Sequence, residues 1–215
     1  MDKVNSLYFF MAPPAPAPAT RTARGESTRE RLLEAARAEI IASQGEMELA
    51  AVAKRAGVSP GLPYRYFDSK SALLVAVVES FFDAVDAAVY RPVFEEVSTD
   101  WWERENARIA AMVDFFYDVP LGPFIVTQLA GDAAVVEAQH RRLTRQVRGA
   151  ARNVQTGKKV GRVPARVDEQ ISGALLMGGV YQAIHFALTS KPRIRKHRLV
   201  SELQDFMRHV LQIEE

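Results

Sequence analysis

Apolar positions recur at helical spacing from about Gly25 to the C-terminus, and no segment shows the strict alternation that is expected of a strand. The first helix is predicted to begin at Ser27 or Thr28, with Glu30 completing a capping box, and to end near Gly45. Further helices are predicted at residues 48–56, 59–67, 69–91, 99–117, 124–130, 132–154, 165–190 and 196–212. The pattern therefore predicts an all-α fold.

Segments rich in proline and glycine separate these helices. The tract Pro13–Ala19 alternates alanine with proline, so it cannot form a helix and has nothing to bury. Breaks are also predicted at residues 119–123 and 156–164. We predict a disordered arm at 1–25, a helix-turn-helix domain at 26–72, and a larger helical domain at 73–215.

The segment Leu49–Lys70 has the spacing of a helix-turn-helix. Ala53 is small enough for two helices to cross closely, Gly57 allows a left-handed turn, and Val58 is predicted to fill the core between them. Ser59 then caps a helix with Pro60 at its first position. An ordinary αα-hairpin can also have a glycine at its turn, so the spacing alone leaves that alternative open.

The residues around this segment resemble the DNA-binding domain of the TetR family of bacterial repressors. The family pattern combines a capped first helix carrying an arginine and paired leucines with an A-G-V-S turn and a Y-x-Y-F-x-S-K motif. The matching residues are Thr28, Leu32, Leu33, Val52, Ala53, Ala56, Gly57, Val58, Ser59, Gly61, Tyr64, Tyr66, Phe67, Ser69, Lys70 and Leu73. The resemblance implies a homodimeric, ligand-responsive regulator that binds double-stranded DNA.

The resemblance also implies which residues contact the operator. A tyrosine hydroxyl donates to phosphate with little entropy lost, Arg65 is the candidate for reading guanine, and Lys70 lies where a helix N-terminus binds phosphate. The predicted contacts are Arg21, Arg24, Thr28, Ser59, Gly61, Leu62, Tyr64, Arg65, Tyr66 and Lys70. Plain core packing is the alternative for Tyr66 and the favoured interpretation for Phe67.

Three positions depart from the family pattern. Glu48 stands where the second helix usually begins with Ser or Thr, and its carboxylate would repel DNA. Ala50 replaces a common arginine, and Pro63 lies inside the first turn of the predicted recognition helix. These departures affect the expected operator sequence rather than the expectation of DNA binding.

Aromatic residues are abundant between residues 81 and 124, more than a bare helical bundle needs. Core packing is the ordinary interpretation of each one. Together with the family resemblance, the set predicts an apolar pocket for a hydrophobic or aromatic effector. The predicted lining is Trp102, Phe116, Phe124, Gln128, Met177, Tyr181 and His185.

Gly173, Gly178 and Gly179 interrupt an otherwise apolar helix, which indicates that another helix approaches closely. The resemblance implies that the last two helices form a four-helix bundle with a second copy of the chain. Packing within one subunit is the alternative. The arginine-rich face of residues 141–152 is predicted to be solvated.

Composition narrows the remaining function classes. The net charge of +2 requires any positive DNA-binding surface to be local, and the absence of cysteine suits a reducing cytosol. The four histidines lack metal-ligand spacing, so neither a metal nor a cofactor is expected. No apolar run is expected to approach the ~20 residues that span a bilayer, so no membrane partner is expected. Asp2 argues against a signal peptide, and a start at Met11 fits the sequence better.

The sequence thus predicts a cytoplasmic transcriptional regulator, a repressor released from a palindromic operator by a small molecule. Two alternatives stay open. An all-helical enzyme would use the aromatic cavity, although no nucleophile–base pair or paired carboxylates are visible at useful spacing. A DNA-binding protein without an inducer would have the same N-terminal motif.

Overall fold

The computed structural model describes residues 23–90, 95–127 and 131–214, and within them the secondary structure is helical throughout. The expected all-α fold is confirmed for this part of the chain. The elements are α1 (Ala23–Ala42), α2 (Leu49–Arg55), the 3₁₀ turn η1 (Pro63–Arg65), α3 (Lys70–Val89), α4 (Trp101–Asp118), α5 (Gly122–Thr127), α6 (Ala133–Lys159), α7 (Glu169–Thr189) and α8 (Lys196–Leu211).

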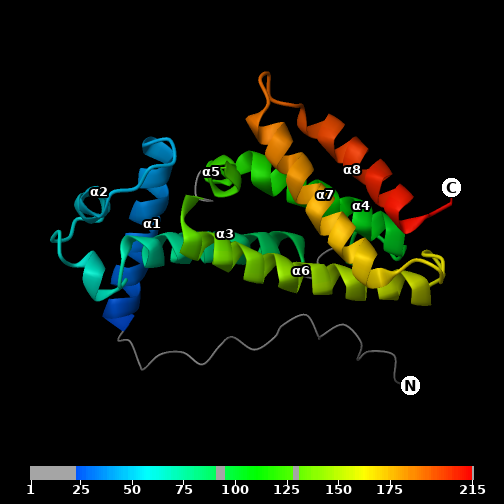
Figure 1. Ribbon diagram of the computed structural model, residues 1–215, viewed down its shortest axis with the longest axis horizontal. Helices are drawn as coiled ribbons and strands as arrows, with labels where there is room; N and C mark the ends of the chain where they lie inside the picture. The colour runs from blue at the N-terminus through cyan, green and yellow to red at the C-terminus, as the bar shows by residue number, and fades with distance from the viewer. Residues whose placement is uncertain (1–22, 91–94, 128–130, 215) are drawn as a thin grey trace.

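The helices form a small N-terminal group and a larger bundle that share α3 (Figure 1). The start of α3 packs with α1, which also packs with α2, and the rest of α3 lies beside α4 and α6. In the bundle, α7 packs between α6 and α8, and α4 closes the other side of α8. Helix α3 therefore connects the helix-turn-helix region directly to the centre of the molecule.

Short polar side chains fix the start of most long helices. Ser69 accepts a hydrogen bond from the amide of Ala72 at 3.0 Å and caps α3, as predicted. Asp100, Asp132 and Asp168 cap α4, α6 and α7 in the same way. These caps satisfy backbone donors that the first turn of a helix leaves unpaired.

Helix α1 begins earlier than predicted. It starts at Ala23, so Ser27 and Glu30 lie inside the helix and the expected capping box is wrong. Ala23 and Arg24 are good helix formers, and Glu26 in the first turn complements the helix dipole. The first 22 residues of the predicted disordered arm lie outside the described residues.

The predicted third helix is the largest difference. Residues 59–67 form turns and the single 3₁₀ turn η1 instead of an α-helix. Pro63 has no N–H, so it cannot make the first α-helical bond back to the carbonyl of Ser59. That carbonyl accepts instead from Leu62 at 3.0 Å, with the i,i+3 spacing of a 3₁₀ turn.

Helix α6 continues five residues beyond its predicted end at 154. Gly157 stays helical and is buried against Trp101 and Val163; a Cβ placed there would lie 2.7 Å from Val163 Cγ2. The helix ends at Lys159, and Gly161, two residues later, has a left-handed φ of 76°. A glycine that was interpreted as a helix breaker is therefore a packing residue.

Helix α7 is long and apolar enough, by length and composition alone, to cross a membrane, so the expectation that no segment reaches this length is wrong. In the fold it packs against α6 on one side and α8 on the other, which is the position of a core helix. A Cβ at Gly173 would lie 2.9 Å from backbone atoms of Val147 and Ala151 in α6. At Gly179 it would meet Phe206 of α8 at 2.5 Å. These two glycines thus serve packing within the chain.

Candidate DNA-contact surface and ligand pocket

The turn after α2 is a Schellman motif built around Gly57. The amide of Val58 donates to Ala53 O at 3.0 Å, and that of Gly57 donates to Lys54 O at 3.1 Å. Gly57 has a left-handed φ of 67°, as predicted. From α1, Arg31 donates to the carbonyl of Ala56 at 2.5 Å and holds the turn against the first helix.

The segment after this turn presents most of its predicted contacts to solvent. Ser59, Gly61, Tyr64 and Arg65 are all exposed, and Tyr64 keeps 60% of its surface although it is a large aromatic residue. Arg65 makes no ion pair with any other described residue. A Cβ at Gly61 would meet nothing within 4 Å, so its small size is not required by packing within the chain.

Other predicted contacts are partly enclosed. Thr28, Leu62 and Tyr66 are half-buried, and Tyr66 packs against the hydrophobic core. Phe67 is 6% exposed, with the guanidinium of Arg29 5.2 Å from the centre of its ring. Core packing for Phe67, the favoured interpretation, agrees with this burial.

Lys70, the expected phosphate ligand, is already paired. Its ammonium lies 3.0 Å from the carboxylate of Glu48, the residue at the N-cap position of α2. Glu48 makes no capping hydrogen bond of its own. The departure from the family pattern at residue 48 therefore places a carboxylate beside the predicted phosphate site.

Two arginines of the predicted arm cannot be placed at this surface. Arg21 lies outside the described residues, and the side chain of Arg24, in the first turn of α1, lies outside them too. Their predicted groove or phosphate contacts remain predictions.

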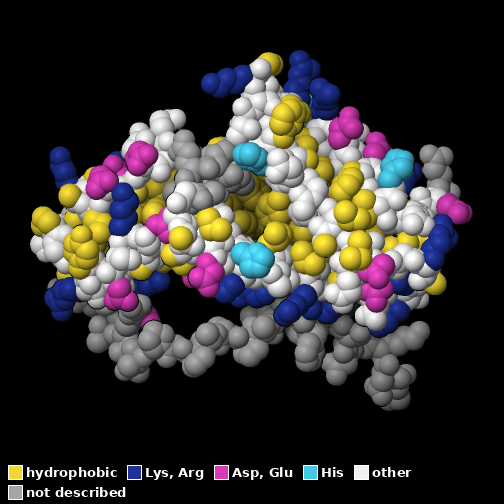
Figure 2. Space-filling model, in the orientation of Figure 1, with side chains coloured by type: hydrophobic (Ala, Val, Ile, Leu, Met, Phe, Trp, Pro, Cys, Tyr) yellow, Lys and Arg dark blue, Asp and Glu magenta, His cyan; other side chains and the backbone are white. Residues whose placement is uncertain are grey.

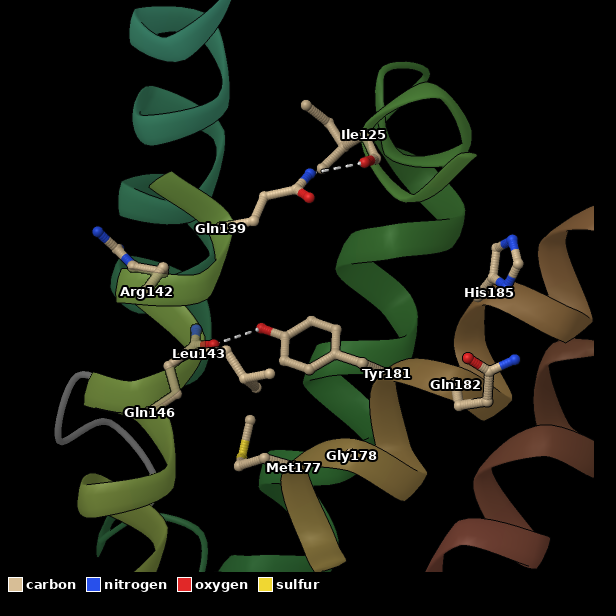
Figure 3. Close-up of a pocket in the computed structure, with 10 residues that line it drawn as sticks. All are labelled: Ile125, Gln139, Arg142, Leu143, Gln146, Met177, Gly178, Tyr181, Gln182 and His185. Atoms are coloured by element: carbon tan, nitrogen blue, oxygen red, sulfur yellow. Dashed lines mark hydrogen bonds between the residues drawn. The ribbon is translucent and has the colours of Figure 1, made fainter. Parts of the chain in front are cut away.

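A second candidate site is a pocket of ≈ 420 Å³ between α5, α6 and α7. Figure 2 shows it as a hollow with a largely hydrophobic floor. The lining residues are Ile125, Gln139, Arg142, Leu143, Gln146, Met177, Gly178, Tyr181, Gln182 and His185. Figure 3 shows Tyr181 crossing from α7 towards α6, with Gln182 and His185 farther along α7. This size and lining are typical of a small-molecule site.

A polar network forms one wall of the pocket. The Tyr181 hydroxyl donates to Gln146 Oε1 at 3.1 Å, and burial raises the pKa of that hydroxyl. Arg142 is 8% exposed and donates to Asp83 at 2.8 Å and to Asp86 at 2.6 Å, both on α3. Burial raises the pKa of Asp86, while Arg142 and the Gln146 side chain lower it.

Three of the predicted pocket residues, Met177, Tyr181 and His185, line this pocket. Phe116 is fully buried behind it and packs edge-on against Tyr181, with ring centres 5.9 Å apart. Trp102 does not line this pocket, and the guanidinium of Arg208 in α8 lies 5.8 Å from the centre of its ring. Phe124 is half-buried against the core and does not line the pocket either, and Gln128 lies outside the described residues.

The α6 side of the pocket was not predicted. Arg142 belongs to an arginine-rich stretch that was expected to be solvated, and for this residue that expectation is wrong because two aspartates of α3 bind it. Gln139 precedes Arg142, and Leu143 and Gln146 follow it, at helical spacing on the same face of α6. That spacing was the signal in the sequence that could have identified them.

Comparisons with known proteins found a matching family model and similar solved structures. Residues 32–77 match the family model described as bacterial regulatory proteins, tetR family. Those residues include the Schellman turn, Tyr64, Arg65 and the start of α3. The family match covers the helix-turn-helix segment and the start of α3, and the likeness to solved structures extends the shared fold over most of the chain. A comparison with curated protein sequences found no match.

Three solved structures share the fold of this protein over most of the chain. FadR from Bacillus halodurans has a TM-score of 0.72 at 16% identity, covering 91% of this chain and 100% of its own. FadR from Bacillus subtilis, in complex with stearoyl-CoA, has a TM-score of 0.67 at 14% identity, with coverages of 83% and 96%. RolR in complex with resorcinol has a TM-score of 0.63 at 21% identity, with coverages of 89% and 95%. These likenesses concern the fold.

Proposed function

We propose that this protein is a cytoplasmic, homodimeric repressor that binds a palindromic DNA operator and is released from it by a small molecule. The observation that carries the proposal is the exposed pair Tyr64 and Arg65 inside the segment that matches the family model. A tyrosine hydroxyl suits phosphate, and a guanidinium that forms no ion pair with the described residues suits the O6 and N7 atoms of guanine.

Support for a dimer comes from an apolar face of α7 that this chain leaves uncovered. Ile171, Leu175 and Phe186 are 61%, 53% and 63% exposed, which is unusual for large apolar side chains on a helix of the core. Gly178 lies among them, with nothing within 4 Å of a Cβ placed there. A second copy would bury this face and present two recognition segments to the DNA.

Support for control by a ligand comes from the attachments of α6. Arg142, in the pocket wall, binds two aspartates of α3, the helix that begins in the DNA-binding region. At the start of α6, Asp132 accepts a hydrogen bond from Ser71 in the first turn of α3 at 2.5 Å. A ligand that moves α6 would therefore move α3, provided that its affinity differs between the two arrangements.

The experiment is DNase I footprinting of the DNA upstream of the protein's own gene, with the wild type and with Arg65→Ala. The proposal predicts a protected region containing an inverted repeat with half-sites about one helical turn apart. The wild type should protect this region from cleavage, and Arg65→Ala should not. Absence of protection at concentrations where the folded wild-type protein is in excess would contradict the operator assignment for this region.

A further inference from the structure

The charges around the pocket neutralise one another before any ligand arrives. Arg142 is the lining residue with a permanent charge, and both of its described ionic contacts are to aspartates of α3. Figure 3 shows its side chain on the α3 side of α6, away from Tyr181. Arg145 also acts electrostatically on Asp86, so two guanidiniums face two carboxylates.

Apart from His185, the other lining groups are amide, phenol or apolar side chains and glycine. Gln139 donates to the carbonyl of Ile125 at 3.1 Å, and Gln146 accepts from Tyr181. Gln146 is 9% exposed, and its side chain also acts on Asp86, whose pKa it lowers. The side chains of Ile125, Leu143 and Met177 supply the apolar contacts.

A charged ligand would be poorly stabilised in such a pocket. An ionised group loses its water on entry and is compensated only by an opposite charge or several hydrogen bonds. An anion would compete with Asp83 and Asp86 for Arg142, and a cation would compete with Arg142 for the same aspartates. An uncharged ligand avoids this competition and can still form a hydrogen bond with a neutral lining amide such as that of Gln182.

We propose that the effector of this pocket is an uncharged, mainly apolar molecule with a hydrogen-bonding group, selected because the Arg142–Asp83–Asp86 cluster leaves no charge free. The proposal rests on the proposed function, since it names the chemical class of the ligand at the same site. The three charged residues are positioning residues for this selectivity and are not required to touch the ligand.

The test uses three planar compounds of one shape that differ in charge: 4-phenylbenzamide, 4-phenylbenzoate and 4-phenylbenzamidine, with single-ring benzamide, benzoate and benzamidine as a smaller set. Binding to the full-length protein is measured by titration calorimetry at pH 8, where the carboxylate and the amidinium are both ionised. The amide of at least one set is expected to bind about tenfold more tightly than either charged partner. Stronger binding of a charged member, or no binding by either set, would overturn the proposal.

Two variants test the cause of the selectivity. Replacing both partners of Arg142, by Asp83→Asn with Asp86→Asn, should free the guanidinium and raise the relative affinity of the carboxylate about tenfold. Arg142→Gln should instead favour the amidinium, which keeps the test decisive if one variant does not fold. The matched control is Asp114→Asn with Asp118→Asn, which removes two carboxylates from Lys196 elsewhere in the bundle. An unchanged order of affinities in both folded variants would contradict the assigned role.

DNA binding is measured on the same preparations, because it does not depend on these compounds. Operator binding that survives while no amide is selected would overturn the ligand class and leave the proposed DNA function standing. If the wild type binds no operator but still selects the amide, the proposed DNA function is contradicted and the proposed ligand class stands.

Discussion

Glu48 has the strongest local effect on the predicted DNA surface. Its carboxylate is 74% exposed and pairs with Lys70 at 3.0 Å. An exposed ion pair of this kind contributes only about 0–1 kcal/mol to stability, so it is easily exchanged for a phosphate. Until that exchange, Glu48 both repels the DNA backbone and occupies the ammonium that would bind it.

The first prediction concerns Glu48→Ser. Removing the carboxylate frees Lys70, and the serine can cap α2, so DNA affinity should rise roughly fivefold, which corresponds to about 1 kcal/mol. The free energy of unfolding should increase by about 0.5–2 kcal/mol from the new cap. Fluorescence anisotropy and urea denaturation measure the two effects. Glu46→Ser removes a neighbouring exposed carboxylate that pairs with no described cation, and an equal gain in that control would contradict a specific role for Glu48.

Asp132 carries a second prediction, on pH. The hydroxyl of Ser71, together with the first amides of α6, lowers the pKa of its carboxyl group below the ordinary value. A carboxyl group whose pKa is lower in the folded state binds its proton more weakly there than in the unfolded chain. The contribution of ionised Asp132 to the free energy of unfolding is therefore complete above about pH 4. It is lost as the pH falls through the lower pKa that Asp132 has in the folded state.

Asp132→Asn should remove this acid sensitivity, since asparagine also caps helices well. Between pH 5 and pH 3, the wild type should lose more unfolding free energy than the variant, as measured by denaturation in urea. Asp205→Asn, an exposed carboxyl group on α8, is the control. Parallel curves for the wild type and Asp132→Asn would rule out the proposed ionic contribution.

Among the elements, helix α7 has glycines in two different packing environments, one against α6 and one open to solvent in the single chain. Gly173 faces the backbone of α6, which cannot move aside, whereas Gly178 faces open space in the single chain. Gly173→Ala should therefore destabilise the protein by about 1–3 kcal/mol. Gly178→Ala should be neutral or stabilise the isolated subunit by up to about 1 kcal/mol. Urea melts compare the two variants, and equal effects would contradict the assigned crossing of α6 and α7.

The order of the helices was predictable from the sequence because apolar periodicity and capping residues identify long helices well. The predicted helix starts at residues 69 and 132 agree with the structure, in which Ser69 and Asp132 are the N-caps of α3 and α6. Helix ends were less predictable, since Gly157 stays helical only because Trp101 and Val163 pack against it. The η1 segment was mispredicted because Pro60 and Ser59 signal a helix start, whereas Pro63 removes the bond that would continue it.

At the scale of the whole molecule, the exposed face of α7 is the surface for which a second subunit is proposed. Leu175→Glu should place two like charges near the twofold axis and convert a dimer into monomers. DNA affinity should then fall at least tenfold, because one recognition segment binds alone. Val97→Glu changes an equally exposed apolar residue away from this face. Sedimentation velocity gives the oligomeric state, and a dimer that persists in Leu175→Glu would contradict the proposed interface.

The two candidate sites differ in how far the sequence alone could define them. The DNA surface is a contiguous segment, so its motif predicted the exposed positions of Tyr64 and Arg65. The pocket is assembled from α5, α6 and α7, and its α6 wall depends on how that helix is rotated. Arg142 shows the difficulty, since its burial follows from two aspartates some 56 to 59 residues away in the chain.

The central claim is that the segment containing Tyr64 and Arg65 reads an operator. The most direct measurement is the fluorescence anisotropy of labelled upstream DNA fragments across a salt series, with the wild type, Tyr64→Ala, Arg65→Ala and, as a control, Arg198→Ala on α8. We expect saturable, salt-sensitive binding to one fragment by the wild type and by Arg198→Ala. Tyr64→Ala should weaken binding evenly, and Arg65→Ala should lose the preference for that fragment. Equal, weak binding to every fragment, unaffected by either substitution, would contradict the proposal that this segment reads an operator.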